Sequence, residues 1–202
     1  MRRFQLTGGD LSLDFVNTLD SRPSEKRKEL LPTFGDVCSW ARQASVITER
    51  QEKALKRKAA ARPREAETAR RRIVAARECL FRILAAIAER EKIPEGDLER
   101  WNRLARRAAV RFELVQREQG LAFRSAADPS FESLLWPVVH SAVRLLTGPE
   151  VSRLRRCASE ECDWMFLDRS KRGNRRWCDM TVCGNRAKAR RFYSRRKKSQ
   201  RG

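Results

Sequence analysis

Apolar residues recur at three- and four-residue steps through much of the first 150 residues. The clearest run lies between Arg64 and Glu91, where apolar residues return to one face and predict a helix with a buried stripe. Thr33 and Thr48 each stand before a shorter run, and a threonine in that position caps the first turn of a helix. Helices are therefore expected over residues 33–44, 48–60 and 64–91, from Pro94 onward, and over 131–146 with a kink at Pro137.

The pattern changes to alternation around Gly120. Phe112 and Leu114 alternate with other residues before this glycine, and Leu121 and Phe123 do so after it. Alternation is typical of strands with one buried face, and the glycine marks the turn that joins them. The first 150 residues are therefore predicted to be mainly α-helical, with one small β-hairpin.

Positive charge is concentrated late in the chain. The 202 residues include 46 Lys+Arg and 26 Asp+Glu, a formal net charge of +20. From Val151 onward there are 17 basic and 5 acidic residues, so this last quarter holds about three fifths of the excess. Such a field attracts polyanions, although arginine is abundant throughout and total charge alone identifies no partner. We expect two modules, a helical body over residues 1–150 and a basic module over residues 151–202.

No stretch of the chain predicts contact with the membrane interior. The longest aliphatic run, Ile83 to Ala88, is far shorter than the ~20 residues that a bilayer requires. The first ten residues do not continue into the apolar region of a secretory signal. We therefore expect a cytoplasmic protein. In that reducing compartment, close cysteine pairs indicate metal binding or catalysis rather than disulfides.

Four of the six cysteines form two equally spaced pairs. Cys157 and Cys162 are separated by four residues, fifteen residues follow, and Cys178 and Cys183 repeat the spacing. Two short loops that each supply two thiolates can surround one tetrahedral zinc ion. Because protein would fill all four positions, such a zinc site is structural rather than catalytic. An iron–sulfur cluster and a redox switch remain open as alternatives.

The segment between the cysteine pairs resembles a small hairpin. Residues 163–177 read as a strand, a turn at residues 171–174 and a second strand, which the metal would hold together. Its aromatic residues are Trp164, Phe166 and Trp177. A module of this size needs them as its core, so we expect them to be buried rather than to stack on bases.

Beyond Cys183 the chain is predicted to form a basic helix. A helical wheel places Val182, Ala189, Phe192 and Tyr193 in one arc, which we expect to pack on the hairpin. The remaining surface is cationic and has the size of a helix that enters the major groove of DNA. The alternative is a solvated or frayed basic tail. The residues predicted to contact nucleic acid are Arg175, Arg176, Arg186, Lys188, Arg190, Arg191 and Arg195.

These residues resemble a known family. The tetrapeptide Cys183-Gly184-Asn185-Arg186, with both cysteine pairs in place, is similar to the CGNR zinc finger of bacterial proteins. The opening segment GGDLSLDFVNTLD, residues 8–20, resembles the start of the ABATE domain that accompanies this finger. Together they cover nearly the whole chain, although the middle helices match in pattern only. The resemblance implies a stress-responsive DNA-binding transcription regulator with four cysteine zinc ligands.

Three classes of function remain to be separated. The first is a DNA-binding regulator, whose body binds a small-molecule effector or forms a homodimer. The second is a protein that binds RNA or the ribosome through the same basic module. The third is an enzyme with a pocket near Asp14 and Asn17, two polar residues in an apolar run that hydrogen bonds at a helix end would also explain. No catalytic triad, phosphate-binding loop or glycine-rich nucleotide motif is present, so we expect no enzyme. His140, Cys38 and Cys79 are expected in the core.

Overall fold

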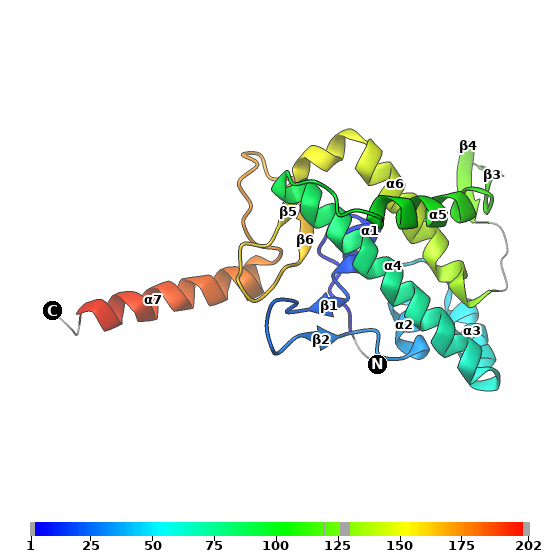
Figure 1. Ribbon diagram of the computed structural model, residues 1–202, viewed down its shortest axis with the longest axis horizontal. Helices are drawn as coiled ribbons and strands as arrows, with labels where there is room; N and C mark the ends of the chain where they lie inside the picture. Colours follow the sequence, from blue (N-terminus) through cyan, green and yellow to red (C-terminus); the bar gives the residue numbers. More distant parts are fainter. Residues whose placement is uncertain (1–2, 119, 126–129, 200–202) are drawn as a thin grey trace.

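The computed structural model describes residues 3–118, 120–125 and 130–199 (Figure 1). Its fold is mainly helical, as predicted. The helices of the body are α1 (Leu11–Val16), α2 (Phe34–Gln43), α3 (Glu49–Ala61), α4 (Pro63–Glu89), α5 (Asp97–Ala109) and α6 (Trp136–Thr147), with 3-10 turns η1 (Phe131–Leu135) and η2 (Pro149–Arg153).

Short strands form three antiparallel pairs within the described residues. They are β1 (Leu19–Asp20) with β2 (Lys28–Glu29), β3 (Phe112–Arg117) with β4 (Gly120–Ser125), and β5 (Leu154–Arg156) with β6 (Met165–Leu167). A single π-helical turn, η3 (Met180–Gly184), then continues into the last helix, α7 (Asn185–Ser199), which projects from the rest of the molecule (Figure 1).

The long helix α4 organises the body. It packs against α1, α2, α3, α5 and η1, and its predicted apolar stripe is buried at Ile73, Leu80 and Ile83. The caps predicted at Thr33 and Thr48 are confirmed, because each side chain accepts a hydrogen bond from the backbone N–H three residues ahead. Each cap is reciprocated by a side chain in that first turn, which completes a capping box.

Two prolines begin or precede helices instead of bending them. The helix expected over residues 131–146 is divided into η1 and α6, and Pro137 lies in the first turn of α6. A proline fits there because the first N–H groups of a helix have no partner within it, so the predicted kink is wrong. Pro94 precedes α5, whose N-cap is Gly96 with a positive φ of 78°.

The hairpin predicted around Gly120 is confirmed as β3 and β4. Its register pairs Phe112 with Ser125 and Arg117 with Gly120. The expectation for His140 was wrong, since this residue lies on the exposed face of α6, with its ring centroid 5.0 Å from that of Phe112. Both cysteines outside the paired set, Cys38 and Cys79, are buried in the core as expected.

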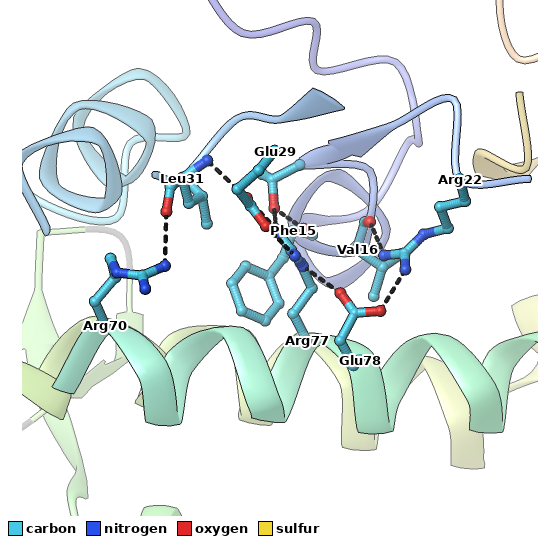
Figure 2. A network of polar contacts seen from close by, with 9 residues as sticks. Phe15, Val16, Arg22, Glu29, Leu31, Arg70, Arg77 and Glu78 are labelled. Carbon is cyan, nitrogen blue, oxygen red and sulfur yellow. Dashed lines mark hydrogen bonds and ion pairs between the residues drawn. The ribbon is translucent and has the colours of Figure 1, made fainter. Parts of the chain in front are cut away.

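A buried arginine fastens the β1–β2 hairpin to α4 (Figure 2). Arg77 is only 1% exposed and donates two hydrogen bonds, of 2.7 and 2.6 Å, to the carboxylate of Glu29. Although burial opposes ionisation, the hydrogen bonds from Arg77 keep the pKa of Glu29 below its usual value. Glu78 links this pair to Arg22, which also donates to the Val16 carbonyl at 2.8 Å. These ion pairs fix the hairpin's orientation on the body.

The hydrophobic core of the body extends past residue 150. Leu154 of β5 and Met165 and Leu167 of β6 belong to the same buried cluster as the helices. The two modules therefore share packing. No helix in the described part of the chain is both long and apolar enough to cross a membrane.

Candidate metal centre and basic helix

The four paired cysteines converge on one point. Their sulfur atoms all lie within 4.8 Å of one another and all four residues are buried. The Sγ of Cys178 lies 3.6 Å from that of Cys162 and 3.7 Å from that of Cys183. Four sulfurs at Zn–S distances of about 2.3 Å around a tetrahedral ion are separated by about 3.8 Å, whereas a disulfide requires about 2.05 Å. The cluster fits one structural Zn²⁺.

Short local contacts set the ligand positions. Cys157 directly follows β5, and its N–H donates to the carbonyl of Trp164 at 2.8 Å across the hairpin. The N–H of Cys178 points at the Cys157 sulfur, 3.5 Å away, an arrangement that supports a thiolate. Cys183 lies in η3 at the start of the basic helix. The metal thus joins the β5–β6 hairpin to the root of α7.

The pKa values of the four thiols are also consistent with a bound cation. Hydrogen bonds from the thiols of Cys162 and Cys178 lower the pKa of Cys157. The same contact with Cys157 raises the pKa of Cys162 and of Cys178, and burial raises that of Cys183. Without a metal, one thiolate therefore opposes the formation of the others. A bound divalent ion removes this opposition, because it stabilises all four thiolates together.

The hairpin of the finger lies elsewhere than the sequence suggested. Strand β6 pairs with β5, which precedes the first cysteine pair, and not with the residues before Trp177. Cys157 and Cys162 therefore lie in the connection of this hairpin. Asp168 holds the following loop by accepting hydrogen bonds from the N–H groups of Ser170 and Arg175, both at 2.9 Å. Those side-chain contacts replace the predicted second strand.

The expected small core of the finger is confirmed. Trp164 and Phe166 are buried with the four cysteines, and Trp177 packs against them. The prediction that apolar residues of α7 pack on the hairpin is wrong, because Phe192 is 60% exposed and Tyr193 is 67% exposed. Of the residues predicted to pack there, Val182, which precedes α7, packs on the cluster. Helix α7 points away from the body, so its later apolar residues do not reach the hairpin (Figure 1).

The CGNR tetrapeptide forms the junction between the metal site and α7. Asp179 caps η3 by accepting from the N–H groups of Thr181 and Val182, and the Asn185 side chain donates to the Thr181 carbonyl at 3.0 Å. A Cβ on Gly184 would meet the side chain of Met180. The hydrogen bonds of Asp179 and Asn185 fix the direction in which the helix starts.

Two of the predicted nucleic-acid contacts have partners inside the finger. The Arg175 guanidinium donates to the carbonyls of Trp177 and Cys178 and lies 4.4 Å from the Phe166 ring centroid. Arg190 lies 3.7 Å from the carboxylate of Glu161, which ties α7 to the first cysteine loop. Both side chains therefore stabilise the finger itself.

The other predicted contacts lie on the surface or outside the described side chains. Arg176 is exposed beside the ring of Trp177, and Arg186, Lys188 and Arg191 are exposed on α7. Arg195 is in α7, but its side chain lies outside the described part of the structure. The exposed cations closest to the metal-anchored end of the helix are therefore Arg186 and Lys188.

Asn17 connects the body to the finger. Its side-chain NH₂ donates to the Met165 carbonyl, and its side-chain oxygen accepts from the Met165 N–H, both at 2.9 Å and both buried. The N–H of Leu167 donates to the Gly8 carbonyl beside it. The sequence marked Asn17 as unusual because it interrupts an apolar run, but the partner, 148 residues away, had no local signal.

Asp14, unlike Asn17, lines a surface depression of about 330 Å³, which Asp10 also lines. Its carboxylate accepts the Gly8 N–H at 2.8 Å. Burial is the main reason that the pKa of Asp14 rises to about 6, and the nearby charge of Asp10 adds to the shift. The ligand pocket at these residues stays a prediction.

We expect Asp14→Asn to stabilise the protein at pH 8 by on the order of 1–3 kcal/mol, and less at pH 5. Because the folded-state pKa exceeds the unfolded value, wild type loses stability as pH rises through about 6. The asparagine keeps an acceptor for Gly8 but has no proton to lose. Urea unfolding of the zinc-loaded proteins between pH 5 and pH 8 measures the difference. Parallel curves across that range would contradict the shifted pKa.

Two known families match separate parts of the chain. Residues 9–149 match the ABATE family, described as "Putative stress-induced transcription regulator", and residues 153–196 match the CGNR zinc finger. A search among curated proteins gave no match. Both descriptions concern regulators and zinc fingers rather than enzymes. Since the first match spans well over half of the sequence, this chain belongs to the ABATE family, and its ABATE domain is followed by a CGNR zinc finger.

Proposed function

We propose that this protein is a DNA-binding transcription regulator in which the zinc finger presents helix α7 to duplex DNA. One observation carries the proposal: α7 projects from the body, and its fifteen residues include eight Lys+Arg and no Asp or Glu. A single α-helix fits the major groove. Its root is held by the cysteine cluster and the Asp179 cap, so its first turns have a fixed base. The proposed function places the protein in the cytoplasm beside the chromosome.

In this proposal the helical body is the sensor or interaction module. Helix α1 supports that role because it carries Asp14 at a surface depression and is followed directly by Asn17, which holds β6. A small molecule or partner bound near Asp14 would thus act on the segment that holds the finger. Homodimerisation through the body would serve the same purpose by bringing two α7 helices to one site.

The double substitution Arg186→Ala, Lys188→Ala is expected to weaken binding to duplex DNA. Each lost phosphate contact should reduce the slope of log affinity against log salt by about 0.9. If either side chain reads a base edge, a further loss of about 1–3 kcal/mol will appear only on the preferred sequence. Titration of a labelled duplex, obtained by in vitro selection, and of a scrambled duplex across salt measures both effects.

The matched control is Arg50→Ala, Arg57→Ala, which removes two exposed cations from α3 at the opposite end of the body. Its salt slope should equal that of wild type. Equal losses in both variants would show that charge alone matters and would remove α7 from the proposal. Tighter binding of an RNA hairpin than of any duplex DNA would replace DNA with RNA as the partner.

A further inference from the structure

We propose that the β1–β2 hairpin of the ABATE domain provides a second contact with the DNA backbone, beside the root of α7. The inference rests on the proposed function and adds a part of the body to the DNA-binding surface. Three consecutive exposed cations form this second contact: Lys26, Arg27 and Lys28, called here the hairpin cations. Glu25 precedes them and Glu29 follows them, and the charge of Glu29 is paired with Arg77.

The hairpin cations lie next to the start of α7, although about 160 residues separate Lys26 from Arg186 in sequence. Lys28 and Arg186 line the same groove, of about 250 Å³, between the hairpin and the cysteine cluster, and Arg3 lines it as well. In Figure 1, β1 and β2 lie on the side of the body from which α7 projects. Cations from three distant segments therefore surround the point where the basic helix starts.

The interior of this groove is not the proposed contact. Asp20 and Asp179 line it, as do three of the cysteines, whose thiolates carry negative charge when the metal is bound. These negative charges would repel an anion inside the groove. Lys26 and Arg27 do not line the groove, and Lys28 is exposed although it lines the groove, so a phosphate can approach all three from solvent.

The hairpin presents its cations on a fixed backbone. Glu29, the next residue, is held by two hydrogen bonds from the buried Arg77 (Figure 2). In the turn, the N–H of Lys26 donates to the Ser24 hydroxyl at 3.1 Å, and the N–H of Arg27 donates to the Ser24 carbonyl at 3.0 Å. Because this backbone is already ordered, binding a phosphate costs less conformational entropy than it would in a free tail.

The position of the finger relative to the hairpin is held by Asn17, which makes two hydrogen bonds from the body to Met165 of β6. The hairpin cations and the start of α7 therefore keep one relative position. Exposed Lys and Arg side chains in a row suit contacts with phosphates, which position a protein on DNA. We infer that α7 enters a groove while the hairpin cations contact the flanking backbone of the same duplex.

The test compares Lys26→Ala, Arg27→Ala, Lys28→Ala with Arg50→Ala, Arg57→Ala, Arg103→Ala in the full-length, zinc-loaded protein. The control removes three exposed cations from α3 and α5. Fluorescence anisotropy with a duplex of about 25 base pairs, across salt, gives the affinity and its salt slope. The hairpin variant should lose about 0.9 in slope, or about eightfold in affinity at 0.1 M salt, for each phosphate contact removed. The loss should be the same on preferred and scrambled duplexes.

Each outcome separates the two proposals. If wild type binds no duplex DNA, the proposed function fails and this inference fails with it. If wild type binds and the hairpin variant keeps the slope of the control, the inference alone is overturned. If the triple variant misfolds, as judged by zinc content and circular dichroism, Lys26→Glu, Arg27→Glu leaves the strand residue Lys28 in place and must reduce the slope by about 0.9 for each of the two contacts.

Discussion

Replacing Cys178 by Ser is expected to release the metal and to lower the thermal midpoint of the whole chain. A structural zinc site contributes on the order of 10 kcal/mol, comparable to the entire stability of a small domain. The finger's core consists of the four ligands with Trp164 and Phe166, so it has little else to hold it. Because Met165 and Leu167 on the same strand pack in the body, the loss should spread beyond the finger.

Elemental analysis and thermal unfolding monitored by circular dichroism measure this result. The control is Cys79→Ala, which removes a buried thiol that belongs to the body and whose hydrogen bond goes to the Asp97 carbonyl. That variant should keep one zinc per chain and lose only about 1–2 kcal/mol. A Cys178→Ser protein that retained zinc and the wild-type midpoint would contradict the four-cysteine site.

The second large effect is expected from Asn17→Leu, which should reduce the free energy of unfolding by about 2–5 kcal/mol. Leucine has a similar size but cannot bond the Met165 N–H and carbonyl, which both lie buried at the contact between body and finger. Each buried backbone group left without a partner costs about 1–3 kcal/mol. Urea unfolding of the zinc-loaded protein measures the change.

Asn102→Leu makes the same chemical change at an exposed position of α5 and should alter stability by no more than about 0.5 kcal/mol. Zinc content distinguishes a loosened contact from a lost finger, since the Asn17→Leu variant should still bind one zinc. Equal stability of the two variants would mean that the body and finger do not depend on this bond.

Features encoded within a few residues could be predicted from the sequence. Thr33 and Thr48 were identified as caps because each directly precedes a helical run, and the groups that they bond lie only three positions later. The cysteine pairs and the hairpin at Gly120 carry equally local patterns. In each case the chemistry that forms the element is contained in one short segment.

Features that depend on distant partners could not be predicted in the same way. Strands β5 and β6 have three residues each, too few for alternation to show which segment pairs with which. Arg77 stands in an arginine-rich run that resembles a solvated helix face, and only the carboxylate of Glu29 explains its burial. Phe192 and Tyr193 suggested a packed seam, but the direction of α7 depends on the metal junction and not on their spacing.

The alternation along β6 has a consequence for how these domains can be recombined. Trp164 and Phe166 belong to the core around the metal, while Met165 and Leu167 belong to the core of the helical body. In a chimera of this body with a finger from a distant relative, the foreign finger would supply its own zinc ligands and aromatic residues. The chimera should therefore still bind zinc. Its residues at 165 and 167 would have been selected against another body, so such grafts should need compensating changes in α1 and α4.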